Sequence, residues 1–477
     1  MRRPGRSSPA LSRRSRDHRT VSRWLERLLG LPLRRMPAYA SVSILICSVI
    51  FLVALTGSAL DVWRYPGEDL RPKVVAVRAI LRGLNPYAYE VGPETPEQLI
   101  DYTRPWAKMA GSHKSPAILL LYAPTSSLPW RSQRLLWMVV EWMAMIGSIL
   151  LLSRCCRRPT HRLAFICIAC YFFVGGHFWR LHVERGQDYV FLVLLQALGV
   201  SWLMRRRHSE VVSGLPIGAA MALRPTLLAL APVLWLVGLR RMASSGLATS
   251  ALVILATLPL VGLAGWVEFQ RAVTQLEQIA LGNKDLDARL GHPYRPSSPI
   301  VEGYDYSVRM YIPPQSQDLT LTYLGGTVLP RVQSEQPLRR AWPLITRSLA
   351  VLTVIGFAGL AWIGHRRGLS TRAGLALAIL GGLAMDYLVG VVRTSYTDVG
   401  FLIPIALLLP ILLDQRTPRL FGIMVLSGLV AGSTGWVVLG VILRSVGVFG
   451  GLALCAAWLC LGARPKASPP LRGSVEA

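Results

Sequence analysis

Apolar stretches of about 20 residues recur along this chain, and they limit the folds that it can adopt. A helix of this length crosses the hydrocarbon core of a bilayer, where only helices and closed barrels satisfy their own backbone hydrogen bonds. Charged residues make up only 16% of the chain, whereas about 25% is usual for a soluble protein. The sequence therefore predicts an all-α polytopic membrane protein.

Twelve apolar segments are candidate transmembrane helices, so we expect about twelve spans. They are residues 38–60, 134–153, 163–178, 188–204, 211–224, 226–239, 246–266, 342–363, 372–392, 398–414, 420–443 and 445–462. A further apolar segment, residues 116–129, is shorter and contains Pro124. We expect it to dip into the membrane rather than span it, because the arginine clusters of the later short loops then lie on the same side as the basic N-terminal tail. These clusters are residues 154–158, 205–207, 240–241 and 366–367.

The predicted topology places both termini in the cytoplasm and two long loops outside a plasma (inner) membrane. It divides the chain into a basic cytoplasmic tail, a membrane module with the first outer loop, a second outer loop, C-terminal transmembrane helices and a second tail. These parts are residues 1–37, 38–266 with the loop 61–115, 267–341, 342–463 and 464–477. Within the first outer loop, residues 74–81 and 96–110 predict helices on the membrane surface.

The net charge of +27 could indicate a nucleic-acid-binding protein, but the positions of the arginines argue against it. They lie mainly in the N-terminal tail and in short loops, where basic residues orient helices and contact anionic lipid head groups. No basic face with interleaved aromatic residues occurs outside the membrane plan. The expected partners are therefore membrane lipids and not nucleic acid.

Ionisable residues within or beside the predicted spans lie mainly toward the outer side. They are Glu141, Arg185, Asp188, Arg224, Arg347, Asp386, Arg393 and Asp398. An isolated charge in the middle of a bilayer is costly, so this one-sided arrangement predicts a polar cavity that opens outward. Asp386 and Arg347 could pair with each other. Arg224 lies in a tight outer turn before Pro225, where its guanidinium could bind a phosphate.

Asp61 directly follows the first apolar segment. A carboxylate at the outer boundary of the membrane is a candidate for chemistry on a lipid-borne substrate. The alternative is an interfacial residue at the end of a helix without a catalytic role. The residues alone leave both interpretations open.

Five segments, taken in order, point to a family. They are Asp61-Val62-Trp63-Arg64-Tyr65, Arg82-Gly83-Leu84-Asn85-Pro86-Tyr87, Ser115-Pro116-Ala117 with Pro124 and Pro129, Arg185-Gly186-Gln187-Asp188, and Ser213-Gly214 through Arg224-Pro225-Thr226. The chain resembles the polyprenol-phosphate-sugar-dependent glycosyltransferases of family 87, which have the C-type membrane glycosyltransferase fold. The likeness covers residues 38–266 and is weaker beyond. The chain departs from the family pattern at Asp188, where Asn is usual, and at residues 393–398, where a His is often present.

The resemblance implies that the protein is a hexosyltransferase. It would move a hexose, often mannose, from a polyprenyl-phosphate donor to a lipid-linked or glycan acceptor on the extracytoplasmic side, with inversion, as a polyprenol-phosphate-mannose-dependent α-mannosyltransferase does. Asp61 would be the general base, and Arg224 and Arg185 would bind the donor phosphate. The residues expected in the sugar or acceptor pocket are Tyr65, Arg64, Asn85, Tyr87, Gln187, Asp188, His292 and Asp398. No metal or other cofactor is expected, and the protein is expected to be a monomer.

Three other classes of function remain open, and one of them is a non-catalytic assembly subunit. A transporter or flippase of lipid-linked glycans would place its site near the membrane midplane between internal repeats, and no repeat is evident in this chain. A polymerase or ligase of cell-envelope polysaccharide also uses arginines and outer loops, but without an Asp immediately after the first span.

Overall fold

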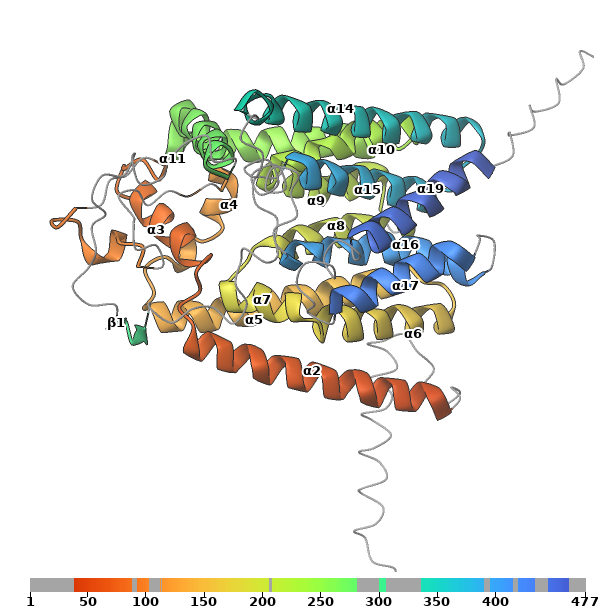
Figure 1. Cartoon of the computed structure of the whole chain (residues 1–477), viewed down its shortest axis with the longest axis horizontal. Coiled ribbons are helices and arrows are strands. Elements are labelled where there is room, and N and C mark those ends of the chain that lie inside the picture. Colours follow the sequence, from red (N-terminus) through yellow and green to blue (C-terminus); the bar gives the residue numbers. More distant parts are fainter. Residues whose placement is uncertain are drawn as a thin grey trace, which may run out of the picture.

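The computed structural model shows a helical bundle that ends in a layer of short helices and loops (Figure 1). It describes residues 38–87, 92–102, 112, 114–205, 208–280, 300–305, 336–389, 395–414, 419–433 and 445–462. Apart from one two-stranded hairpin, the regular elements among these residues are helices. Both predicted tails lie outside the described residues.

Helices occupy all twelve predicted apolar segments, at least in part. In chain order they are α2 (Ala38–Arg64), α5 (Trp130–Ser153), α6 (Pro159–Ile168) with η4 (Ala169–Val174), α8 (Tyr189–Met204), α9 (Glu210–Leu223), η5 (Pro225–Ala229) with α10 (Leu230–Leu236), α11 (Arg240–Ala280), α14 (Gln336–Arg366), α15 (Thr371–Val389), α16 (Leu402–Leu413), α17 (Arg419–Ser433), and η9 (Ser445–Gly450) with α19 (Gly451–Gly462). The all-α fold class predicted from the sequence is therefore confirmed.

Several of these helices are long and apolar enough to cross a membrane. Among the described residues there are five such candidates, which are Ala38–Arg64, Trp130–Ser153, Arg240–Gln275, Ala341–Arg366 and Tyr396–Leu413. The pair Pro159–Val174 and Trp179–Arg185, bent by 52°, is a sixth if it forms one span. The chain is thus a polytopic membrane protein, with five or six candidate spans in the part of the chain that the structure describes.

One end of the bundle carries the first outer loop, and we call it the loop end. It contains α3 (Arg71–Ile80), η2 (Glu97–Leu99), α4 (Pro116–Leu120), η3 (Ala123–Thr125) and the antiparallel hairpin of β1 (Ile300–Val301) and β2 (Tyr304–Asp305), at the left of Figure 1. The apolar segment 116–129 forms only short helices here. Like α8, α9 and α10, it is a shorter apolar helix that falls below the length of the candidate spans, so the predicted dip stays a prediction.

The setting of α3 differs from the prediction. A helix is present where residues 74–81 predict one, but all its residues are buried in protein rather than spread on a membrane surface. The reason is a separate apolar cluster at the loop end, in which Val74 and Val77 pack with Trp130 and Tyr304. The second predicted surface helix, residues 96–110, is described only in part and contains η2.

The short turns at the other end of the bundle hold the described residues of the predicted arginine clusters, and we call it the arginine end. Its turns are tied to one another. Arg158 forms an ion pair with Asp414, and Arg372 donates a hydrogen bond to the Cys155 carbonyl oxygen at 2.6 Å. Asp61 lies in the last turn of α2 at the loop end, so Asp61 and the described arginine clusters lie at opposite ends of the bundle.

Close contact between α9 and α11 fixes the direction of α9. A Cβ added to Gly218 would lie 2.1 Å from the Gly246 carbonyl oxygen, and one added to Gly214 would lie 2.5 Å from the Met242 carbonyl oxygen. Small residues at such interfaces allow helix backbones to approach closely in membranes. The end of α9, where Arg224 follows, is therefore held in place by this contact.

Gly218→Ala should destabilise the protein by roughly 1–3 kcal/mol, because the new methyl group would collide with backbone that cannot rotate away. The measurement is the free energy of unfolding of the purified protein in detergent. Gly359→Ala on α14 is the matched control, since no heavy atom lies within 4 Å of its added Cβ. Equal stabilities of the two variants would contradict the close approach of α9 and α11.

Candidate functional site

Asp61 is buried in the last turn of α2 and forms a two-point ion pair with Arg180 of α7 (His177–Arg185). Arg180 Nε donates to Asp61 Oδ2 at 2.5 Å, and Nη2 donates to Oδ1 at 2.8 Å. The Asp61 side chain is 1% exposed, whereas the Arg180 side chain is 36% exposed. The pair therefore holds the carboxylate in one orientation and leaves its guanidinium partner accessible.

The neighbouring residues explain where Asp61 lies. The sequence predicts that the first span ends at residue 60, but α2 continues to Arg64 and includes Asp61. No helix-breaking residue occurs until Pro66, which disfavours helical backbone at the residue before it. The Tyr304 hydroxyl donates to the Val62 carbonyl oxygen at 3.0 Å. This bond anchors the β1–β2 hairpin of the second outer loop against the end of α2.

A second buried carboxylate, Asp188, follows α7 and contacts two lysines. Lys73 Nζ of α3 lies 2.8 Å from Asp188 Oδ1, and Lys114 Nζ lies 3.0 Å from the same oxygen. Lys73 also donates to the Gly186 carbonyl oxygen at 3.0 Å. None of the three charged side chains is more than 9% exposed. One carboxylate that faces two lysines leaves one positive charge in excess.

The ionisation of this group follows from its contacts. Burial disfavours the charged form of Asp188, but Lys114 and Lys73 outweigh burial and hold the pKa of this carboxyl well below its usual range. Burial lowers the pKa of Lys73, and the Asp188 carboxylate opposes that shift. Asp188 is therefore ionised at neutral pH and supplies the counter-charge for the lysines.

Arg224 lies at the same end, between α9 and η5. Its Nε donates to Asp386 Oδ1 at 2.8 Å, and the Thr226 hydroxyl donates to the same oxygen at 2.7 Å. Burial alone would lower the pKa of Arg224, but the Asp386 carboxylate outweighs burial and raises that pKa above its usual value. Asp386 thus pairs with Arg224, and its suggested pairing with Arg347 stays a prediction.

The Tyr189 ring lies close to both Arg224 and Lys114. Lys114 Nζ lies 5.1 Å from the ring centroid, and the Arg224 guanidinium carbon lies 5.4 Å from it. A cation within about 6 Å of an aromatic face is attracted by the ring quadrupole. We name the whole group the cationic cluster, and it comprises Lys73, Lys114, Arg224, Asp188 and Asp386.

Arg185 and Gln187 lie against acidic residues of the first outer loop. Arg185 forms ion pairs with Asp69 and, at 3.6 Å, with Glu68. The Gln187 amide donates to the Asp69 carboxylate, and the Asp69 backbone N–H donates to the Arg185 carbonyl oxygen at 3.0 Å. These contacts fasten the start of the first outer loop to the end of α7.

Asn85 and Tyr87 form a turn that leads toward Lys114. The Asn85 side chain accepts a hydrogen bond from the Tyr87 backbone N–H at 2.9 Å, and the Tyr87 hydroxyl donates to the Lys114 carbonyl oxygen at 2.8 Å. Burial raises the pKa of Tyr87. The turn therefore supports the backbone that positions Lys114.

The remaining predicted pocket residues lie on η8, at the end of α2 and outside the described residues. Asp398 is buried in η8 (Ser395–Phe401) and accepts a hydrogen bond from the Tyr387 hydroxyl at 2.5 Å. Tyr65 is half-buried, and Arg64 is exposed at the end of α2. His292 lies outside the described residues.

Arg180, Lys73 and Lys114 are not among the site residues predicted from the sequence. Arg180 lies within a helix and is 119 residues from Asp61 along the chain, so no local pattern connects them. The two lysines could have been recognised from the distribution of lysines in the sequence. The chain has only five lysines, and three of them fall in the first outer loop, which is unusual where almost every basic residue is arginine.

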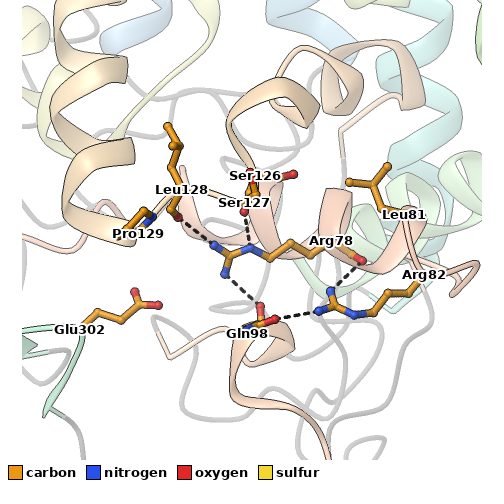
Figure 2. Close-up of a pocket in the computed structure, with 9 residues that line it drawn as sticks. All are labelled: Arg78, Leu81, Arg82, Gln98, Ser126, Ser127, Leu128, Pro129 and Glu302. Carbon is orange, nitrogen blue, oxygen red and sulfur yellow. Dashed lines mark hydrogen bonds between the residues drawn. The ribbon is translucent and has the colours of Figure 1, made fainter.

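A cavity of about 470 Å³ lies at the outer side of α3 (Figure 2). Arg78 crosses it, and its guanidinium donates to the carbonyl oxygens of Ser126 at 2.7 Å and Gln98 at 3.2 Å. Arg78 is five residues from Lys73, which places the two side chains on different faces of α3. The lining of this cavity includes neither Asp61 nor any member of the cationic cluster.

The donor atoms at the loop end suit an anion better than a metal ion. Among the described residues, no group of three or more His, Cys, Asp or Glu side chains is arranged to hold a metal. In the cationic cluster, three cations face two carboxylates, so an added negative charge would complete the charge balance. Lysine and arginine are the usual protein partners of phosphate groups.

Comparison with known proteins gives one match. A protein-family model described as Glycosyltransferase family 87 matches residues 114–390, more than half of the chain. The matched range contains Asp188, Arg224 and Asp386, and it begins after Asp61. No curated protein and no solved structure matches the chain.

Asp188→Asn should destabilise the protein by roughly 3–5 kcal/mol, because it leaves two buried lysines without their counter-charge. Adding Lys73→Met should recover part of the loss, since it removes one of the two uncompensated cations. The measurement is a double-mutant cycle on the free energy of unfolding in detergent. Glu94→Gln is the control, because it neutralises an exposed carboxylate of the same loop. A fully additive cycle would show that Lys73 and Asp188 do not interact.

Proposed function

The chain belongs to glycosyltransferase family 87, as the sequence resemblance predicts, and from this premise we propose a specific reaction for it. It transfers a hexose, with mannose as the expected sugar, from a polyprenyl-phosphate donor to a lipid-linked or glycan acceptor. The reaction inverts the anomeric centre and takes place on the extracytoplasmic side. The family match supports glycosyl transfer, and the geometry at the loop end supports the roles assigned below.

The Asp61–Arg180 ion pair is the observation that carries this proposal. An acceptor hydroxyl loses its proton as it attacks the anomeric carbon, and a positioned carboxylate can take that proton. A carboxylate offers about four lone-pair sites, and the hydrogen bonds from Arg180 occupy one on each oxygen. Asp61 therefore keeps the capacity to accept a proton while Arg180 fixes its orientation. We assign Asp61 as the general base and Arg180 as a positioning residue.

The cationic cluster suits the departing phosphate. As the acceptor oxygen bonds to the anomeric carbon, the bond from that carbon to the phosphate oxygen breaks, and the polyprenyl phosphate leaves with the electron pair. Fixed cations stabilise the charge that develops on it. We assign Lys114 and Arg224 to this role, because they flank Tyr189 in a cluster with one excess positive charge. Arg185 faces two carboxylates, so we assign it to holding the loop.

The proposed topology has twelve spans, with both termini in the cytoplasm and the loop end outside. In support, the described arginine clusters lie at the end of the bundle remote from Asp61, and short loops rich in arginine favour the cytoplasmic side. In this topology the shorter apolar helices, such as α9 and α10, also cross the membrane.

The location of the charges favours transfer over transport. Transporters of charged or polar substrates place their sites near the membrane midplane, between repeated halves. Here Asp61 lies in the last turn of α2 and Asp188 in the turn after α7, and their cationic partners lie in α7, in α3 and just before α4, all at the loop end. A site at one membrane surface suits a donor and an acceptor that meet in one leaflet.

Asp61→Asn should lower kcat by roughly 10²–10⁴-fold, because an amide oxygen is too weak a base to take the hydroxyl proton. The measurement is transfer of radiolabelled hexose from polyprenyl-phosphate hexose to acceptor by the purified protein in proteoliposomes. The KM for the donor should change little, since the donor phosphate is held elsewhere.

The matched control for this variant is Asp414→Asn. It also removes the carboxylate of an Asp–Arg ion pair, with Arg158, but at the arginine end. Its activity should equal that of the unaltered protein. A folded, membrane-inserted Asp61→Asn protein that kept the same kcat would overturn the assignment of the base.

Lys114→Gln should raise the KM for the donor roughly tenfold, which corresponds to one charge-assisted hydrogen bond to phosphate. Folding should be retained, because Asp188 would still face Lys73 in a balanced pair. Steady-state kinetics with varied donor give the measurement. Arg271→Gln is the control, since Arg271 is 71% exposed and pairs only locally with Glu268. Equal effects of the two substitutions would place the phosphate away from Lys114.

A further inference from the structure

A groove of about 560 Å³ lies between α9 and α11 at the arginine end. Its polar part is formed by Arg240, Arg241 and Ser244 in the first turns of α11. Its apolar part is formed by Val211 and Leu215 of α9 together with Leu252 of α11. The groove is thus cationic at the end of the bundle and apolar toward its middle.

Among the residues that the structure describes, no carboxylate pairs with either arginine of the groove. Both are exposed, and neither forms an ion pair or hydrogen bond with the residues that the structure describes. Glu210, at the start of α9, forms no ion pair with either of them. By contrast, Arg158 and Arg372 at the same end bind Asp414 and a backbone carbonyl oxygen. The charge in the groove is therefore available to an external anion.

The apolar part of the groove faces away from the protein core. Val211 and Leu215 are each 45% exposed, and Leu252 is 65% exposed. Arg241, Ala248 and Leu252 share one face of α11, and 11 residues of helix separate the first from the last, or about 17 Å at 1.5 Å per residue. This spacing fits an amphiphile with a charged head and a long apolar chain.

We propose that this groove binds one anionic phospholipid in the leaflet remote from the loop end. Its phosphate lies between Arg240 and Arg241 with Ser244 as a hydroxyl donor, and one acyl chain follows Leu215 and Leu252. Basic pockets between transmembrane helices bind anionic head groups by this combination of charge and apolar contact. A zwitterionic lipid carries no net charge to complement the two guanidinium groups. The site is separate from the proposed reaction, because α9 and α11 hold it at the opposite end from Asp61.

The test is native mass spectrometry of the full-length protein in detergent, titrated with phosphatidylglycerol or with phosphatidylcholine of the same acyl chains. We expect the unaltered protein to bind one phosphatidylglycerol more tightly than phosphatidylcholine. Arg240→Gln with Arg241→Gln should weaken phosphatidylglycerol binding roughly 30-fold, from the usual contribution of two basic residues near anionic lipid. Ala248→Trp, which fills the groove and keeps both charges, should also weaken it.

The matched control is Arg154→Gln with Arg157→Gln. It removes the same charge from the turn after α5 at the same end, away from the groove. Its phosphatidylglycerol affinity should stay within about threefold of that of the unaltered protein. A change of this size is smaller than the contribution of one basic residue that contacts the lipid. Equal losses in the two double variants, or equal affinity for the two lipids, would overturn the proposal. The same titration on Asp61→Asn should give unchanged lipid binding, so failure of the lipid site and failure of the proposed reaction are distinguishable.

Discussion

A charge buried in this protein needs a partner charge, and this requirement organises the loop end. Removing an ion from water costs several kcal/mol unless an opposite charge and hydrogen bonds replace the lost hydration. Three buried carboxylates meet this requirement through distant segments. Asp61 of α2 binds α7, Asp188 binds α3 and the start of α4, and Asp386 of α15 binds the end of α9. Each ion pair therefore also joins two parts of the fold.

The segment from Arg180 to Asp188 is the common support of these contacts. Arg180 binds the proposed base, and Asp188 binds the lysines of the cationic cluster. Between them, Gly186 adopts a left-handed conformation with φ of 68°, and an added Cβ would lie 2.6 Å from the Leu70 side chain. The turn after α7 therefore needs a glycine to bring the first outer loop this close. In the proposed reaction this one segment aligns the base with the phosphate site.

Physical patterns in the sequence predict the helices better than they predict the site. Hydropathy locates helices on every predicted apolar segment, because each segment satisfies its backbone hydrogen bonds within itself. The proline-broken segment 116–129 forms only short helices, and its predicted dip stays a prediction. Asp61 could be singled out from its place after an apolar run. Its partner Arg180 could not, because the pairing depends on how far α7 bends away from α6. Gly175 and Gly176 mark a break in the helix there, but they do not fix the angle of the bend. The position of the β1–β2 hairpin depends in the same way on contacts between distant segments, namely the bond from Tyr304 to Val62 of α2 and the ion pair of Glu302 with Arg71 of α3.

The central claim is that this chain moves a hexose from a polyprenyl-phosphate carrier. Its most direct test is incubation of the purified protein, in proteoliposomes with a membrane extract as the acceptor source, with radiolabelled polyprenyl-phosphate mannose, glucose or arabinose in separate reactions. The account predicts that label from the mannose donor enters a new product, and that the product is absent without the protein. Label that enters no product from any of the three donors would contradict it.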